Sequence, residues 1–461
     1  MQRFLVSAAH KSSGKTTVSI GLCAALAARG HSVQPFKKGP DYIDPLWLGR
    51  AAGRACRNLD FHLSPPIELK AQFARHGHDA DVCLVEGNKG LYDGLALDGA
   101  NSNAALARLL DLPVVLVLDA RGMTRGIAPL ILGYQAFDRE IRFAGVILNQ
   151  LGGSRHEAKL RAVIEHYTDV PVLGAIGADP RMTLTERHLG LMPANENRAC
   201  DQRIAEIAER IAQQVDLDRL LTATTAARPL PQPLPARTAP ATLSIAVARD
   251  AAFGFYYADD LDAFAAAGAE LLPFDTLKDA RLPECDGLFI GGGFPESFLD
   301  ELEANAALRG DIRAAIEAGL PAYAECGGLM YLARSISWRG VTRRMVGAIA
   351  GDVAMHDKPV GRGYVRLAAQ AEHPWLAGPV AAHEFHYSGL EGLAPDTRFA
   401  YKMERGHGID GTNDGIIHRG LVASYSHLRS TAGSDWVARF VGYVRECKEK
   451  RNSRESQRCL P

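Results

Sequence analysis

Residues 3–30 read RFLVSAAHKSSGKTTVSIGLCAALAARG and decide the fold of the first half of the chain. The segment RFLVSA has the apolar composition of a buried strand, and TTVSIGLCAALAARG has the pattern of a helix that ends at Gly30. Between them, residues 9–16 (AHKSSGKT) follow the phosphate-loop pattern G-x-x-x-x-G-K-[ST], with Ala9 in place of the first glycine. A strand, this loop and a helix in that order predict a nucleotide site, because backbone N–H groups at a helix N-terminus attract phosphate.

The pattern continues through the first half of the chain as short apolar runs that alternate with helical segments. The expected strands are SVQPF, DVCLVEG, PVVLVLDA, FAGVILNQ and PVLGAI, and the helical segments include NSNAALARLL and RHEAKLRAVIEHY. Continuous apolar strands separated by helices indicate a parallel sheet that is covered on both faces.

A change of composition at residues 222–241 (TATTAARPLPQPLPARTAPA) indicates an extended linker. A second α/β pattern follows, with LSIAVA, AELLPF, DGLFIGGG and PAYAEC, and it becomes rich in strands towards the end. We therefore expect two α/β domains, at residues 1–221 and 242–446. The polar segment at residues 447–461 is expected to be disordered.

The overall composition is that of a globular protein. The chain has 461 residues, of which 47% are hydrophobic, and a formal net charge of −1, which argues against broad electrostatic binding to nucleic acid or to a membrane. The N-terminus lacks the pattern of a signal peptide, and no run approaches the roughly 18 apolar residues of a membrane span, so we expect a cytoplasmic protein. The eight cysteines contain no C-x-x-C pair, which argues against a zinc ribbon.

The phosphate loop predicts which residues bind ATP. Lys15 is expected to neutralise the β- and γ-phosphates, and the hydroxyl of Thr16 to bind Mg²⁺. Asn149, at the end of the expected strand GVILNQ, is expected either to recognise the base or to serve as a simple turn residue. The full predicted nucleotide site is Ser12, Ser13, Gly14, Lys15, Thr16, Thr17 and Asn149.

Three acidic residues follow expected strands of the same sheet. Asp41 and Asp44 lie in KKGPDYIDP, and Glu86 ends DVCLVE in the manner of a Walker-B carboxylate. Strand ends of this kind meet at the sheet edge where α/β proteins bind ligands. We predict that Thr16, Asp41 and Glu86 hold Mg²⁺ and that Asp44 is catalytic. The alternative for both aspartates is a turn or capping role.

Cys326 lies where an expected strand meets an expected helix, in PAYAECGGLMYLA (residues 321–333). The two glycines after it would allow the sharp turn of a nucleophile elbow, and a helix N-terminus favours the reactive thiolate. His427 ends a later strand and would serve as the base, while Gly292 and Gly293 in GGGFPES would supply oxyanion donors. The alternative is an inert buried thiol.

Two further patterns resemble functional motifs without their context. Residues 406–411 (GHGIDG) match G-x-G-x-x-G, but no helix is expected after them, so we reject a dinucleotide site. In HEFH, a spacing of three on a strand would send His383 and His386 to opposite faces, which argues against a shared metal. A structural role is the default for both, and the alternative is that one of them lines a pocket.

The motifs GGGFPE, AECGGLMYL and SYSHL, in this order, resemble a class I glutamine amidotransferase domain of the cobyric-acid-synthase type. SSGKTT, KKGPDYIDP, RNLD and EG-x-x-GLYDG resemble the synthetase half of the cobyrinic acid a,c-diamide synthase family, which is related to dethiobiotin synthetase. The sequence departs from these patterns at Ala9, at His10 (which stands where related ATPases have a signature lysine) and at Arg429, where most class I glutaminases have a glutamate. The cobalamin-type branch likewise works with a Cys–His pair.

The resemblance implies two coupled reactions. Cys326 and His427 would release ammonia from L-glutamine, and ATP with Mg²⁺ would convert a substrate carboxylate to an acyl phosphate that ammonia turns into an amide. The implied substrate is a tetrapyrrole, amidated at its a and c acetate side chains, and the resemblance also allows a homodimer.

Two alternatives remain at the level of sequence. EGNKGLYDG and NSNAALARLL differ from the EG-V-M-GLYDG version of corrinoid enzymes, so sirohaem or another sirohydrochlorin-derived macrocycle is an alternative substrate. A P-loop regulatory ATPase with a silent glutaminase domain is the alternative from another class, and the joint presence of Cys326, His427 and the glycine loop argues against it.

Overall fold

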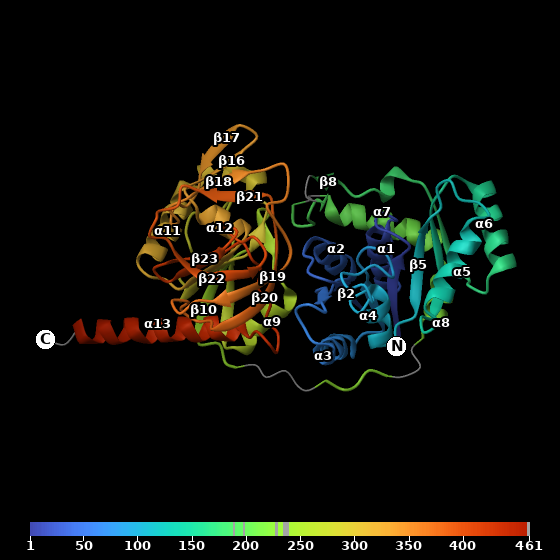
Figure 1. Ribbon diagram of the computed structural model, residues 1–461, viewed down its shortest axis with the longest axis horizontal. Helices are drawn as coiled ribbons and strands as arrows, with labels where there is room; N and C mark the ends of the chain where they lie inside the picture. The colour runs from blue at the N-terminus through green and yellow to red at the C-terminus, as the bar shows by residue number, and fades with distance from the viewer. Residues whose placement is uncertain (188–189, 197–198, 226–228, 234–238, 459–461) are drawn as a thin grey trace. The chain divides into compact units, whose positions relative to one another are not determined.

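The structure, a computed structural model, describes residues 1–187, 190–196, 199–225, 229–233 and 239–458 (Figure 1). The chain divides into two compact units, Met1–Leu234 and Pro235–Pro461, and the division falls within the stretch expected to be a linker. Helix α8 (Leu217–Ala223) includes the first two residues of that stretch, because Leu217 and Leu220 are buried in the first unit. In the described part of the chain, no helix has both the length and the apolar character needed to cross a membrane.

The first unit is built on a seven-stranded sheet with the order β3-β2-β4-β1-β5-β6-β7. Every neighbouring pair in it is parallel, which confirms the predicted parallel sheet. Its strands are β1 (Gln2–Ala8), β2 (Val33–Lys38), β3 (Arg57–Leu59), β4 (Val82–Glu86), β5 (Val114–Asp119), β6 (Phe143–Leu151) and β7 (Val172–Gly177).

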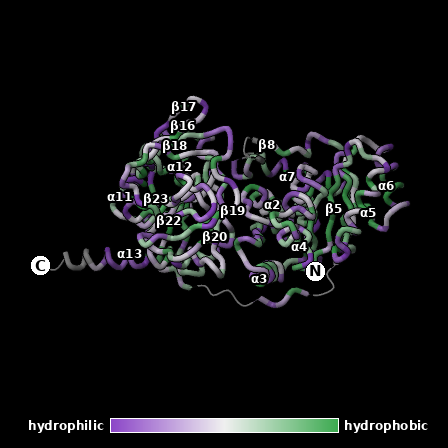
Figure 2. The backbone as a smooth tube through the Cα atoms, in the orientation of Figure 1, coloured by the Kyte–Doolittle hydropathy of each residue, from purple (hydrophilic) through white to green (hydrophobic). Residues whose placement is uncertain are grey.

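Both faces of this sheet are covered by helices. Successive side chains of each strand point to opposite faces, and because these side chains are apolar on both faces, each face is buried by helices. In β1, Phe4 and Val6 pack in the apolar cluster of one face and Leu5 packs in the cluster of the other. Helices α1 (Lys15–Ala28), α2 (Ile43–Ala52) and α7 (Cys200–Gln214) supply the first cluster. Helices α3 (Pro66–Gly77), α4 (Asn103–Leu110), α5 (Ile127–Phe137) and α6 (Ser154–Tyr167) supply the second. Figure 2 shows β5, an inner strand of this sheet, as a hydrophobic segment. Short elements near residue 185 are η1 (Pro180–Met182), β8 (Glu186–Arg187) and β9 (Gly190–Leu191).

The second unit contains a nine-stranded mixed sheet with the order β12-β10-β13-β15-β24-β23-β22-β19-β20. Its parallel part comprises β10 (Leu243–Ala248), β12 (Ala269–Phe274), β13 (Gly287–Ile290), β15 (Ala322–Glu325) and β24 (Leu421–Ser424). Its antiparallel part comprises β19 (Gly361–Ala369), β20 (Gly378–His386), β22 (Arg398–Arg405) and β23 (Asn413–His418). Smaller sheets pair β11 (Phe253–Phe255) with β14 (Gly292–Gly293), and join β16 (Ser335–Trp338), β17 (Val341–Arg344), β18 (Asp352–Met355) and β21 (Ser388–Glu391).

Helices cover both faces of the second sheet as well. Helices α9 (Ala258–Ala266) and α13 (Trp436–Arg458) contribute to one apolar cluster. Helices α10 (Leu299–Ala304), α11 (Ala306–Glu317) and α12 (Gly327–Leu332) contribute to the other, and η2 (Pro295–Phe298) precedes α10. The two α/β units agree with the predicted fold class.

The structure differs from the sequence-based expectation in the tail. Helix α13 continues to Arg458, through most of the segment whose polar composition favoured disorder. Its first part is anchored by buried Trp436, and Lys448 Nζ lies 2.9 Å from a carboxylate oxygen of Asp286. Beyond that anchor the segment is rich in Lys, Arg and Glu, which are good helix formers. Residues 459–461 lie outside the described residues.

Candidate active sites

The loop between β1 and α1 has the backbone of an anion-binding turn. Gly14 precedes α1 with φ of 86°, and Ser12 has φ of 64°. A Cβ atom on Gly14 would lie 2.2 Å from Asn149 Nδ2, so glycine is required there. Asn149 Nδ2 donates to the carbonyl oxygen of Ser13 at 3.0 Å. The structure thus places Asn149 against the phosphate loop, and its side-chain amide stabilises the loop through this hydrogen bond.

The remaining predicted loop residues follow directly. Lys15, Thr16 and Thr17 form the first turn of α1. Burial lowers the pKa of the Lys15 ammonium, and the charge of Glu86 opposes that effect. Ala9 is not among the residues with positive φ, so its position does not require the missing glycine, and its carbonyl oxygen accepts a hydrogen bond from Tyr134 Oη at 2.7 Å.

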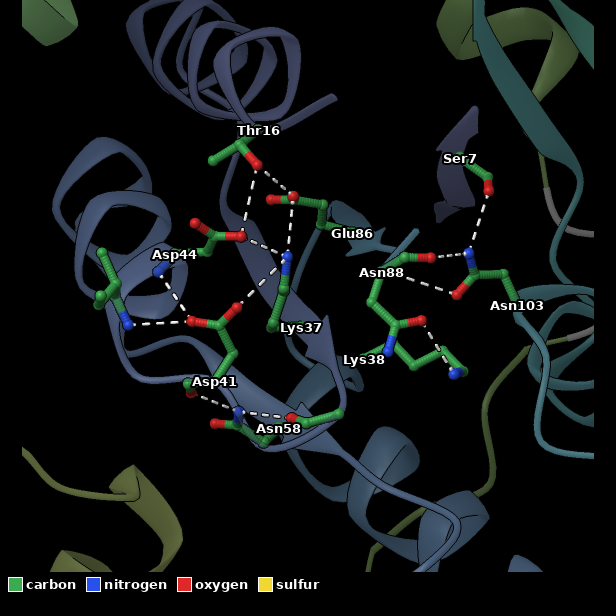
Figure 3. A network of polar contacts seen from close by, with 12 residues as sticks. Ser7, Thr16, Lys37, Lys38, Asp41, Asp44, Asn58, Glu86, Asn88 and Asn103 are labelled. Carbon is green, nitrogen blue, oxygen red and sulfur yellow. Dashed lines mark hydrogen bonds and ion pairs between the residues drawn. The ribbon is translucent and has the colours of Figure 1, made fainter. Parts of the chain in front are cut away.

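A cluster of acids surrounds the buried ammonium of Lys37 beside this loop (Figure 3). Lys37 Nζ lies 2.5 Å from Asp44 Oδ2, 2.9 Å from Glu86 Oε1 and 3.7 Å from Asp41 Oδ2. Thr16 Oγ1 donates to Glu86 Oε1 at 2.7 Å and to Asp44 Oδ2 at 3.3 Å. The structure therefore brings together the predicted residues Thr16, Asp44 and Glu86, with Asp41 at the margin of the cluster.

The two aspartates have different local roles. One carboxylate oxygen of Asp41 accepts the backbone N–H groups of Ile43 and Asp44, which fixes the start of α2. Asp44, in the first turn of α2, is the aspartate whose carboxylate contacts Thr16. The predicted capping alternative thus describes one oxygen of Asp41, and Asp44 is better placed than Asp41 for a shared ligand with Thr16.

Lys37 was missed by the sequence analysis, although a lysine at the end of a buried strand such as VQPFKK is an unusual feature that could have indicated it. Burial alone would lower the pKa of Lys37, but the charges of Asp44, Glu86 and Asp41 raise it well above its usual value. Burial raises the pKa of Glu86, and the charge of Lys37 opposes that rise.

The donor set of this cluster fits Mg²⁺. Mg²⁺ in nucleotide sites takes a hydroxyl, one or two carboxylates and phosphate oxygens, and Thr16, Asp44 and Glu86 present that set. Glu86 Oε2 is buried and has no hydrogen-bond partner among the described residues, so one carboxylate oxygen is left available. Asp41 is the further carboxylate nearest to these groups.

In the second unit, Cys326 occupies the predicted elbow. It follows β15, precedes α12 and has φ of 48° and ψ of −103°, a backbone conformation that is unfavourable for a residue with a side chain. Its backbone N–H donates to the carbonyl oxygen of Ser424 at 2.7 Å. A strained residue between a strand and a helix is typical of a nucleophile elbow.

The glycine loop packs directly against this elbow. A Cβ atom on Gly327 would lie 2.9 Å from the backbone nitrogen of Gly293, and one on Gly292 would lie 2.7 Å from His427 Cε1. The backbone of Gly293 lies too close to Gly327, and the imidazole of His427 too close to Gly292, for a side chain at either glycine. The structure thus brings the predicted oxyanion residues Gly292 and Gly293 to the same place as Cys326 and His427.

His427 is buried between several polar groups. Its backbone exchanges hydrogen bonds with that of His383, and the two imidazole rings stack at 4.9 Å. Burial acts to lower the pKa of His427, but hydrogen bonds and charge interactions with Cys326 and Glu325 raise it to about 10. His386 instead stacks on Tyr425, so the two histidines of HEFH have separate surroundings, and His383 is the one next to the site.

Glu325 was also missed by the sequence analysis. Its Oε2 atom lies 3.3 Å from His427 Nδ1, and the residue is only 3% exposed. The signal in the sequence is a carboxylate at the end of the apolar strand AYAE, one residue before the cysteine.

Comparison with known proteins assigns each unit to a known domain family. Residues 5–191 match the CobQ/CobB/MinD/ParA nucleotide binding domain, and residues 244–434 match the CobB/CobQ-like glutamine amidotransferase domain. A cobyrinate a,c-diamide synthase of Magnetococcus marinus is 43% identical over 96% of this chain and 97% of its own length. Its counterpart in Methanosarcina barkeri is 41% identical over 97% of both chains.

The chain belongs to the cobyrinate a,c-diamide synthase family. A counterpart in Listeria monocytogenes serovar 1/2a is 38% identical over 96% of this chain and the whole of its own length. The predicted family resemblance, with a nucleotide-binding domain followed by a glutamine amidotransferase domain, is confirmed.

Proposed function

We propose that this chain uses ATP and L-glutamine to amidate the a and c acetate carboxylates of cobyrinic acid. The observation that carries this proposal is the similarity over almost the whole chain to cobyrinate a,c-diamide synthases, at 43% identity with the relative from Magnetococcus marinus. The proximity of Cys326 to the glycine loop and of Thr16 to Asp44 and Glu86 supports the proposal.

The second unit releases ammonia. The thiolate of Cys326 attacks the side-chain carbonyl carbon of glutamine, and the N–H groups of the glycine loop stabilise the negative oxygen that forms. His427, which is hydrogen-bonded to Cys326, gives its proton to the departing nitrogen, so that ammonia and a thioester result. Water then cleaves the thioester to glutamate and regenerates the thiol.

The first unit activates the acceptor. A carboxylate oxygen of the substrate attacks the γ-phosphorus of ATP, ADP leaves, and the acyl phosphate that forms is a good acceptor for ammonia. Lys15 holds the β- and γ-phosphates at the start of α1. Thr16, Asp44 and Glu86 would hold Mg²⁺, with Asp41 adjacent, and the bound ion would neutralise charge on the phosphates.

Lys37 organises these acids. Its ammonium compensates three carboxylates in a buried place, and it keeps Asp44 and Glu86 in position near Thr16. Asn149 and Gly14 maintain the shape of the phosphate loop. Ammonia attacks the acyl carbon, phosphate leaves, and loss of one proton from nitrogen completes each amide. The two half-reactions take place twice to give the diamide.

The test is product analysis with purified protein, ATP, Mg²⁺ and glutamine. Cobyrinic acid should lose two carboxylates and gain two amides, detected by mass spectrometry, with ATP hydrolysis that depends on the macrocycle. Parallel incubations with sirohaem and with nickel sirohydrochlorin provide the comparison. Amidation of one of those macrocycles, with cobyrinic acid left unchanged, would overturn the assignment of substrate.

A further inference from the structure

The residue two positions after His427 is a cation in this chain. Arg429 is fully buried, and its NH2 atom lies 3.0 Å from a carboxylate oxygen of Asp259. Its guanidinium also lies 5.1 Å from the centre of the Tyr257 ring. Where most class I glutaminases carry the glutamate that orients the histidine, this chain therefore directs a positive charge towards Asp259.

A different carboxylate reaches His427. Glu325 is the last residue of β15 and is buried. Its Oε1 atom accepts hydrogen bonds from Tyr323 Oη and from the backbone N–H of Leu428, each at 2.8 Å. These donors fix one carboxylate oxygen, and the other, Oε2, faces His427 Nδ1 at 3.3 Å.

This contact determines the state of the imidazole. An ionised carboxylate only accepts hydrogen bonds, so a favourable contact requires that Nδ1 carries a hydrogen, which leaves Nε2 to exchange a proton with the thiol. The carboxylate also stabilises the positive imidazolium that forms when the thiol gives up its proton.

Glu325 supplies a carboxylate at His427 Nδ1, whereas the ring that stacks on His427 carries no negative charge. His383 stacks on its ring, and Tyr257 Oη lies 3.3 Å from His383 Nδ1. Burial, together with the charges of His427 and Arg429, holds the pKa of His383 well below its usual value, so this ring is neutral. The thiol of Cys326 faces His427 from the elbow.

We propose that Glu325, supplied by the strand before the nucleophile, takes the place of the absent glutamate and acts as the positioning residue of the glutaminase site. It holds His427 by Nδ1 while the thiol proton of Cys326 moves to Nε2 and from there to the leaving ammonia. The inference rests on the glutaminase half of the proposed function, and it makes the site a Cys–His–Glu triad whose third member precedes the cysteine by one residue.

The test uses Glu325→Gln in the full chain, because glutamine keeps the size of the side chain and removes its charge. Glutaminase kcat should fall by on the order of 10² to 10⁴, as expected for loss of the carboxylate behind a catalytic histidine. Synthesis from high ammonium should stay within about twofold of the parent, since that half-reaction does not use this site.

A second readout separates positioning from structural support. The rate at which iodoacetamide alkylates Cys326, followed by peptide mass spectrometry, reports the thiolate at each pH. In the parent, alkylation should already be fast at neutral pH, and in Glu325→Gln it should rise only at higher pH. Glu325→Asp, which keeps the charge on a shorter side chain, should recover part of the neutral reactivity.

Asp414→Asn is the matched control. Asp414 is a buried carboxylate that accepts the backbone N–H groups of Gly415, Tyr425 and Ser426, just before His427. The Asp414→Asn variant should have a lower thermal stability than the parent, with the same pH profile of Cys326 alkylation. An unshifted profile in Glu325→Gln, or equal shifts in both variants, would overturn the inference. Because alkylation needs no substrate, this outcome is independent of which macrocycle the protein amidates.

Discussion

Replacing Lys37 with methionine tests the electrostatic organisation of the ATP site. The Lys37 side chain is 4% exposed and that of Glu86 is 1% exposed, so the substitution leaves a buried carboxylate without its cation. Removal of one partner from a buried ion pair costs about 3–5 kcal/mol. Asp44 and Asp41 are 14% and 33% exposed, and water can compensate them in part, so we expect about 3 kcal/mol.

Hydrogen exchange with mass spectrometry measures this cost in the first unit alone. A loss of about 3 kcal/mol should accelerate exchange of β2 and β4 peptides by on the order of 10², since about 1.4 kcal/mol corresponds to a factor of ten. The loss of stability caused by Lys37→Met should depend on pH and should be larger at higher pH. Burial already raises the pKa of Glu86, and loss of Lys37 raises it further. The loss of stability is therefore full above that raised pKa and shrinks as pH falls below it towards the usual range of a glutamate.

Lys38→Met is the control, because Lys38 is the next residue of the same strand and is also buried. Burial lowers its pKa to about 8, and its Nζ atom donates to the neutral Asn88 Oδ1 at 3.1 Å. We expect a loss of about 1 kcal/mol. If Lys37→Met accelerates exchange by less than about threefold, or if both variants lose the same stability, the argument that Lys37 compensates the acidic cluster is wrong.

Three further predictions concern the two half-reactions. Cys326→Ala should eliminate glutamine-dependent synthesis and leave synthesis from high ammonium largely intact; parallel loss with both nitrogen sources would indicate a structural thiol. Lys15→Ala should abolish synthesis from either source, because the phosphates lose their main cation, and near-parental synthesis from ammonium would exclude this loop as the catalytic nucleotide site. Asp44→Asn and Glu86→Gln should each raise the activation free energy of synthesis at saturating ammonium by roughly several kcal/mol, and so lower kcat. The measurement is kcat as a function of Mg²⁺ concentration. Normal turnover in both variants would show that the metal site lies elsewhere.

Much of the architecture could be predicted from local sequence patterns. The strands β1, β4, β5 and β6 are apolar runs bounded by turns, and the phosphate loop is a contiguous motif. Cys326 could be predicted because the elbow, too, is local: a strand, a cysteine and two glycines in succession. Such features depend on residues that are close in sequence, so the sequence alone carries them.

Contacts between distant residues could not be predicted in the same way. Glu325 meets His427 across 102 positions, and Lys37 meets Glu86 across 49 positions. The order of strands in the two sheets creates these contacts, and a single sequence does not specify it. The division of roles between Asp41 and Asp44 depends on which carboxylate turns back to the start of α2, a choice that only side-chain geometry reveals.

Isotope transfer tests the coupling of the two sites most directly. The protein is incubated with cobyrinic acid, ATP, Mg²⁺ and glutamine whose amide nitrogen is isotopically labelled, and the product is analysed by mass spectrometry. We predict a diamide in which both new amides carry the label, and loss of label incorporation in Cys326→Ala. A product without label, or absence of any ATP-dependent diamide from cobyrinic acid, would contradict the account.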